Sequence, residues 1–155
     1  MPILVIEDDE HKRSRVVQHL RVSFPREEVG EAKSVQGGLA ALLSGSWDLV
    51  VLDMTMPTFD IGGDEPGGRP QVYGGGEVLR QLQRKGLRTP VLLLTQFDQF
   101  GEGADALRLE QLDEKMHKLF PENYHGAIFY SVVSEDWREA LTMKVEEIRT
   151  RVNRT

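Results

Sequence analysis

Short, wholly apolar runs alternate along this chain with longer segments in which apolar residues recur every three or four positions. The runs lie at residues 3–6, 49–52, 90–94 and 127–130, and a weaker one lies at 28–32. A short apolar run is typical of a strand covered on both faces, whereas the longer recurrence is typical of an amphipathic helix. The alternation predicts an α/β fold, a doubly wound five-stranded parallel sheet with helices on both faces.

The helices are expected in the segments between and after these strands. The spacing and the capping residues place them at about 10–23, 34–45, 77–85, 109–120 and 134–152. Ser34 and Ser134 are the expected caps of the second and the last helix. The helix between the fourth and fifth strands is expected to be long. The segment at about 58–76 is rich in Gly, Pro and Asp and shows neither period, which predicts an exposed inserted loop.

Composition narrows the class of protein. The chain has 155 residues, enough for one domain with its own core, and we expect residues 1–155 to form a single domain. A net charge of −6 argues against direct nucleic-acid binding. There is no cysteine, and no apolar run approaches the roughly 20 residues of a membrane span, so we expect no membrane partner and a cytoplasmic location.

Acidic and hydroxyl side chains follow three of the predicted strands. Glu7 and Asp8 follow the first, Asp53 the third, and Thr95 ends the fourth. The carboxyl ends of parallel strands meet at one edge of the sheet, where ligands of such folds bind. Carboxylates gathered there repel one another, and a hard divalent cation such as Mg²⁺ is the natural counter-ion. A carboxylate at such a site can also act as a nucleophile and form an aspartyl phosphate.

Three stretches of the chain resemble the receiver domain of bacterial two-component response regulators. They are ILVIEDDEHKRSRVVQHL, DLVVLDMTMP and GGGEVLRQLQRKGLRTPVLLLTQ. The resemblance covers nearly the whole chain and implies a flavodoxin-like sheet with the strand order 2-1-3-4-5. It implies that the protein is not an enzyme, apart from slow autodephosphorylation of the phosphoacceptor.

The resemblance also implies roles for particular residues. Asp53 would accept the phosphoryl group, and Thr95 would hydrogen-bond that group and act as the switch. Mg²⁺ would be held by Glu7, Asp8, Asp53 and the backbone carbonyl of Thr55. A histidine kinase or phosphotransfer protein would supply the phosphoryl group in a phosphorelay, and a downstream effector protein would receive the signal.

The chain departs from this family where the fifth strand ends. The family has a lysine there that pairs with the phosphate, whereas this chain offers Tyr130 or Ser131. Loss of a charge-assisted contact weakens a phosphorylated state. Gln96 also stands where the family has a small residue. A phosphorylation-independent pseudo-receiver that binds proteins is therefore an alternative.

Two enzyme classes share single features with this sequence. An aspartate-nucleophile phosphatase needs a second aspartate two residues after the first, where this chain has Thr55. The sequence Gly62-Gly63-Asp64-Glu65 resembles a diguanylate cyclase motif, which sits on a hairpin between two antiparallel strands. Pro66 replaces the aromatic residue of that motif, and we expect no strands beside it, so the cyclase hypothesis is rejected.

Overall fold

A parallel five-stranded sheet forms the centre of the computed structural model, which describes residues 1–57, 70–71, 74–101 and 103–153. In spatial order the strands are β2 (Val29–Ala32), β1 (Ile3–Ile6), β3 (Leu49–Leu52), β6 (Val91–Thr95) and β9 (Tyr124–Phe129). Counted along the chain within this sheet, the order is 2-1-3-4-5. The predicted fold class and strand order are thus confirmed.

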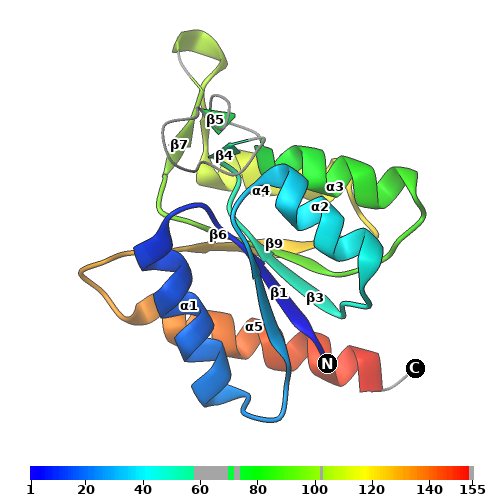
Figure 1. The fold of residues 1–155 in the computed structure, drawn as a ribbon. Helices are drawn as coiled ribbons and strands as arrows, with labels where there is room; N and C mark the ends of the chain where they lie inside the picture. The colour runs from blue at the N-terminus through cyan, green and yellow to red at the C-terminus, as the bar shows by residue number, and fades with distance from the viewer. Residues whose placement is uncertain (58–69, 72–73, 102, 154–155) are drawn as a thin grey trace, which may run out of the picture.

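Five helices cover the two faces of the sheet. They are α1 (Glu10–Ser23), α2 (Val35–Ser44), α3 (Gly74–Arg84), α4 (Leu109–Leu119) and α5 (Asp136–Asn153). In Figure 1, α1 and α5 lie on one face, and α2, α3 and α4 lie on the other. The helices change face after β2 and again after β9, and the three inner strands β1, β3 and β6 are buried at every position.

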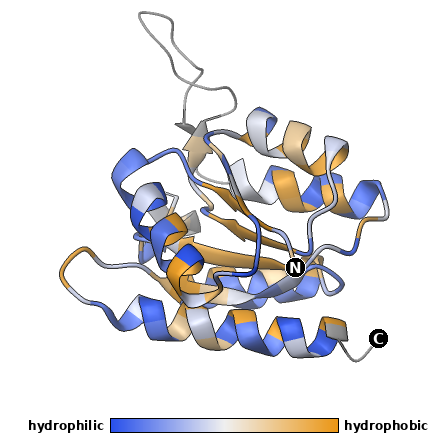
Figure 2. Ribbon diagram, turned by 60° about the horizontal axis from the view of Figure 1, so that its bottom comes forward, coloured by the Kyte–Doolittle hydropathy of each residue, from blue (hydrophilic) through white to orange (hydrophobic). Residues whose placement is uncertain are grey.

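Two apolar clusters, one on each face, form the core. Side chains of each strand alternate between them: Leu4 and Val50 belong to the cluster under α2, α3 and α4, whereas Ile3 and Val51 belong to the cluster under α1 and α5. Trp137 of α5 is 2% exposed and is among the largest side chains of the second cluster. Figure 2 shows the hydrophobic strands at the centre and polar residues along the outer sides of the helices.

Some boundaries differ from the prediction. α3 begins at Gly74 rather than at residue 77, because the glycines at its start fit closely against the backbone after β3. β9 spans Tyr124–Phe129, so Tyr130 follows the strand instead of ending it. Ser34 caps α2 as predicted, with its hydroxyl accepting a hydrogen bond from the Gly37 backbone N–H.

The start of α5 needs a correction as well. The helix begins at Asp136, so Ser134 lies two residues before its first residue. Its hydroxyl nevertheless accepts a hydrogen bond, at 3.2 Å, from the backbone N–H of Asp136.

Short strands flank the inserted segment, contrary to our expectation. β4 (Met56–Pro57) pairs antiparallel with β5 (Pro70–Gln71). Two residues on each side are too few to show a period in the sequence, which is why the pair was not predicted. The GGDEP stretch itself, and the rest of 58–69 and 72–73, lie outside the described residues.

The segment between β6 and α4 is also different from the prediction. α4 has only 11 residues, and the added length forms a second hairpin of β7 (Gln99–Phe100) and β8 (Leu107–Arg108), with a 3-10 turn, η1 (Gly103–Asp105). Phe100 is 2% exposed and joins the core under α4. Figure 1 shows the hairpin standing beyond the carboxyl ends of the central strands. In the part of the chain that the structure describes, no helix is both long enough and apolar enough to span a bilayer.

Candidate functional site

Three carboxylates meet at the carboxyl edge of the sheet. Glu7 and Asp8 follow β1 and Asp53 follows β3, and these two strands are hydrogen-bonded neighbours. One carboxylate oxygen from each residue lies within 4.8 Å of the others. Glu7 and Asp53 are each 3% exposed, whereas Asp8 is exposed to solvent. The sequence therefore predicted correctly that these three acids come together.

Asp9 has a structural role next to this group. Its side chain caps α1 by accepting a hydrogen bond, at 3.0 Å, from the Lys12 backbone N–H. The Asp9 backbone N–H donates in turn to Glu7 Oε2 at 3.2 Å. The turn from β1 into α1 thus fixes the Glu7 side chain and the direction of the first helical turn together.

Lys12, in that first turn, is the feature of the site that the sequence reasoning missed. Its side chain is 3% exposed and its Nζ forms ion pairs with Glu7 Oε1 and with Asp53 Oδ2, the latter at 3.2 Å. Nζ also donates to the backbone carbonyl of Leu94 at 2.6 Å. Lys12 Nζ therefore has two hydrogen bonds, to Asp53 Oδ2 and to the Leu94 carbonyl, and is paired by charge with both buried carboxylates.

A second buried cation supports the turn from outside. Arg13, 6% exposed, donates from Nη1 to the Glu7 backbone carbonyl at 2.9 Å and pairs through Nε with Glu31 of β2 at 3.2 Å. It contacts the backbone of Glu7, so it positions the acid without neutralising its carboxylate.

The charges in the pocket are not balanced by Lys12 alone. Two buried carboxylates face one buried ammonium, and Asp8 adds a third negative charge at the rim. Burial raises the pKa of the Glu7 carboxyl to about 8; the neighbouring Asp53 adds to the rise, and Lys12 opposes it. A proton on Glu7 or an additional cation is needed to offset the excess negative charge.

The residues present fit a hard divalent cation. Asp53 Oδ1 is buried and has no hydrogen-bond partner, so it keeps lone pairs for a ligand. Mg²⁺ binds oxygen at about 2.1 Å, and octahedral geometry places its ligands roughly 3–4 Å apart. The 4.8 Å spread of the three acids is near this range, and the exposed Asp8 leaves a side open to solvent.

Thr95 and Thr55 lie at the same edge of the sheet. The β3–β6 ladder ends with Leu52 opposite Leu93, so Asp53 and Thr95 lie one and two residues beyond it. Thr95 is fully buried, and its hydroxyl accepts a hydrogen bond from the Phe97 backbone N–H at 3.2 Å. Thr55 is half-buried, two residues after Asp53. Their roles toward a metal or a phosphoryl group stay predictions.

The structure settles which residue stands where the family has its lysine. Tyr130 follows β9 directly, donates its backbone N–H to the Thr95 carbonyl at 2.7 Å, and is 1% exposed. Its ring centroid lies 5.6 Å from Lys12 Nζ. The Ser131 hydroxyl instead accepts from the Val133 backbone N–H at 3.2 Å. Tyr130, not Ser131, is therefore the residue at the pocket.

Comparisons with known proteins identify the family to which this fold and this acid pocket belong. The sequence model of the response regulator receiver domain family matches residues 3–122, so the chain belongs to this family of two-component signalling. The predicted resemblance is thereby confirmed.

Two curated relatives match along almost their whole length. The chain is 26% identical over 152 residues to the Detocs response regulatory protein DtcB of Enterobacter cloacae, covering 96% of this chain and all of DtcB. It is 25% identical over 143 residues to the uncharacterized protein y4jR of Sinorhizobium fredii, covering 91% of this chain and 94% of y4jR.

Solved structures share the fold. The N-terminal domain of an uncharacterized Wolinella succinogenes protein superposes with a TM-score of 0.68 at 18% identity, covering all of this chain and 99% of that one. The response regulator TrrA of Thermotoga maritima, solved in complex with Mg²⁺ and BeF, gives a TM-score of 0.58 at 20% identity, covering 92% of this chain and 97% of TrrA.

Proposed function

We propose that this chain is a phosphorelay receiver that accepts a phosphoryl group on Asp53 with Mg²⁺ and signals through a partner protein. The observation that carries the proposal is the convergence of Glu7, Asp8 and Asp53, with the buried Asp53 Oδ1 lacking a hydrogen-bond partner. Membership of the receiver family and the complex of TrrA with Mg²⁺ and BeF support it.

The proposed chemistry uses the residues that the pocket presents. Asp8, Asp53, Glu7 and the backbone carbonyl of Thr55 would hold Mg²⁺, which would offset the charge of the acids and of the incoming phosphoryl group. One carboxylate oxygen of Asp53 attacks the phosphorus of a phosphohistidine. The new O–P bond forms as the P–N bond breaks, and the leaving imidazole nitrogen takes up a proton. The Thr95 hydroxyl, which accepts a hydrogen bond from the Phe97 backbone N–H, would then donate its O–H to a phosphoryl oxygen.

The partners follow from this chemistry. A histidine kinase or phosphotransfer protein would supply the phosphoryl group, and an effector protein would read the changed surface. The net charge of −6 disfavours direct contact with nucleic acid. We also propose that residues 1–155 act as one receiver unit located in the cytoplasm, with an insertion between β4 and α3.

A phosphorylation-independent receiver that only binds proteins is the second candidate function. The low exposure of Asp53, at 3%, favours it, because a phosphodonor must reach this carboxylate. The position of Lys12 favours it too, since its ammonium already pairs with the two buried carboxylates of the acid pocket.

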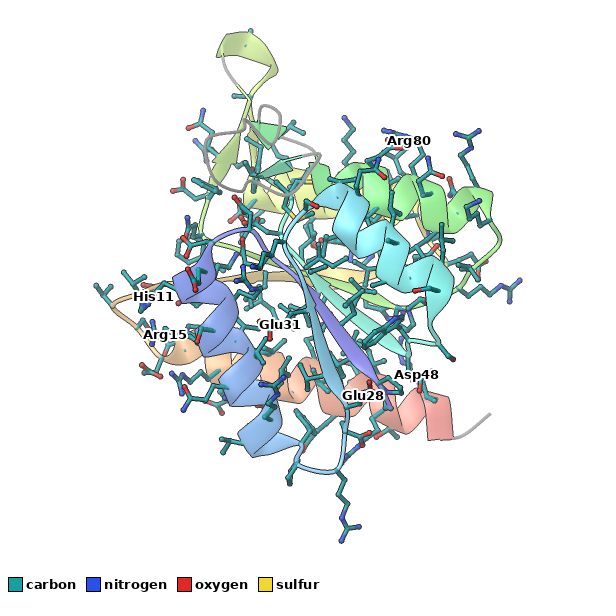
Figure 3. The ribbon with its side chains drawn as sticks, in the orientation of Figure 1. His11, Arg15, Glu28, Glu31, Asp48 and Arg80 are labelled. Carbon is teal, nitrogen blue, oxygen red and sulfur yellow. The ribbon has the colours of Figure 1, made fainter. Side chains whose placement is uncertain are left out.

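Intact mass spectrometry after incubation with acetyl phosphate and Mg²⁺ tests the proposal. Acetyl phosphate transfers its phosphoryl group as acetate leaves, so the wild type should gain the mass of one phosphoryl group. Asp53→Asn should gain none. The control is Asp48→Asn, because Asp48 precedes β3 and lies at the opposite end of that strand from Asp53 (Figure 3). A wild type without adduct would favour the protein-binding alternative.

A further inference from the structure

We propose that Lys12 is the cation that binds the phosphoryl group on Asp53. In this chain the lysine comes from the first turn of α1, and Tyr130 stands at the end of β9 where the family has a lysine. This inference rests on the proposed function and adds the residue that makes phosphorylation possible without that family lysine.

The first step of the argument is the position of the ammonium. Lys12 Nζ lies 3.2 Å from Asp53 Oδ2, the carboxylate that would be phosphorylated. Among the ion pairs that the described residues form, Lys12 provides the one that reaches Asp53. A phosphoryl group attached to Asp53 therefore forms within a few ångströms of this charge.

The second step is charge. Phosphorylation replaces the single negative charge of the Asp53 carboxylate with the two negative charges of an acyl phosphate. The pocket already holds more acid than base, since Glu7 also pairs with Lys12. A buried phosphoryl group needs charge-assisted donors, and a fixed lysine supplies them without the cost of ordering a mobile side chain.

The third step is that Lys12 has a donor to give. One of its three N–H groups binds Asp53 Oδ2, and this oxygen loses its charge when the carboxylate becomes an acyl phosphate. That donor can turn to a phosphoryl oxygen while the contacts to Glu7 and to the Leu94 carbonyl hold the ammonium in place. The exchange requires no movement of α1.

The fourth step is the surroundings of Lys12. Its ammonium lies 5.6 Å from the Tyr130 ring centroid, a cation–π distance. Tyr130 is held by the Trp137 ring, with centroids 5.0 Å apart, and by Arg15, whose Nη1 donates to the Tyr130 hydroxyl at 3.1 Å. Tyr130 thus packs against Lys12 and helps to hold its ammonium in place. The cation beside Asp53 comes from α1 in this chain and not from the position after the last strand.

The affinity for beryllofluoride, a phosphoryl mimic, tests the inference on the whole chain with Mg²⁺ present. Loss of a charge-assisted donor should weaken beryllofluoride binding by about ten- to a hundredfold in Lys12→Met and Lys12→Gln. The double variant Lys12→Met with Tyr130→Lys returns an ammonium to the pocket from the other side, and it should recover most of the affinity. Lys33→Met, at an exposed lysine, is the control and should bind as the wild type does.

A second measurement on the wild type does not depend on whether the variants fold. The side-chain ¹⁵N resonance of Lys12, assigned by through-bond correlation to the Lys12 backbone, should shift when beryllofluoride binds. An unmoved Lys12 resonance, or unchanged affinity in folded Lys12→Gln, overturns the role of Lys12 while the proposed function stands. If the wild type binds no beryllofluoride and forms no adduct on Asp53, both proposals are overturned.

Discussion

The Tyr130 ring lies 5.6 Å from the Lys12 ammonium, although 118 positions separate the two residues along the chain. The ring therefore contacts the charge of the pocket on one side and, at 5.0 Å, the Trp137 ring of the core on the other. Tyr130 thus links the acid pocket to the apolar core. Changes at Tyr130 should thus affect both the stability of the fold and the position of Lys12.

Substitutions at Tyr130 separate its hydroxyl from its ring. Tyr130→Phe removes only the hydrogen bond from Arg15 and should cost about 1 kcal/mol of unfolding free energy. Tyr130→Leu also removes the ring contacts with Lys12 and Trp137 and should cost about 2–4 kcal/mol. Urea unfolding at equilibrium measures both, and equal losses in the two variants would show that the ring contributes nothing.

Removal of Lys12 should destabilise the fold. Lys12→Met leaves Glu7 and Asp53 buried without their counter-ion, and breaking a buried ion pair costs about 3–5 kcal/mol. Adding Glu7→Gln removes one of the two carboxyl groups left without a counter-ion and should recover much of the loss. Equilibrium unfolding of both variants and of Lys33→Met checks this. A double variant no more stable than Lys12→Met would contradict the charge argument.

The sequence predicted the central fold because its strands are short and apolar on both faces. Ile3–Ile6 and Leu49–Leu52 are buried at every position, so they stand out as continuous runs. The hairpins β4–β5 and β7–β8 have two residues per strand, and no periodicity can appear over that length. Their pairing depends on how the flanking segments meet in space.

The acids of the site could be predicted, but Lys12 was not. Glu7, Asp8 and Asp53 follow apolar strands, and strand order alone brings them together. Lys12 stands among charged residues and looks like part of a solvated helix face. A signal was present, because Lys12 lies four and eight residues before the buried Val16 and Leu20 and so continues their inward stripe to the helix start.

Gly75 fixes the backbone that carries the phosphoacceptor. A Cβ at this position would lie 2.5 Å from the Asp53 carbonyl oxygen and 2.9 Å from Met54 Cα, and both are backbone atoms that cannot rotate away. Gly75→Ala should therefore cost about 1–3 kcal/mol of unfolding free energy by overpacking. It should also weaken Mg²⁺ binding, since the turn after β3 must shift.

The matched control for this substitution is Gly37→Ala in α2. Gly37 is half-exposed in a helix, so an alanine there should stabilise the fold by about 0.5–1 kcal/mol. Thermal unfolding gives the stabilities and isothermal titration gives the Mg²⁺ affinity. If Gly75→Ala were as stable as the wild type with unchanged Mg²⁺ affinity, the close fit between α3 and the Asp53 backbone would not be needed to hold the site in place.

His19 should make the stability of the fold depend on pH. It joins α1 to α5, with Nε2 2.8 Å from Thr142 Oγ1 and its ring 5.5 Å from the Trp137 ring. Burial, the main cause, lowers the pKa of His19 below its usual 6.5; the charge of Arg138 lowers it further, whereas an Arg138 backbone contact and Glu135 oppose the shift.

The sign follows from proton binding. As pH falls through 6.5, the unfolded chain binds a proton at His19 while the folded chain does not, so the free energy of unfolding should decrease until the lower folded-state pKa is reached. Above that window the contribution is constant. In His19→Gln this part of the pH dependence should vanish, whereas His11→Gln, at an exposed position of the same helix (Figure 3), should keep it. Denaturant unfolding from about pH 7.5 down to about pH 5, which brackets the usual histidine pKa of about 6.5, measures the slopes, and identical slopes in both variants would rule out His19 as their cause.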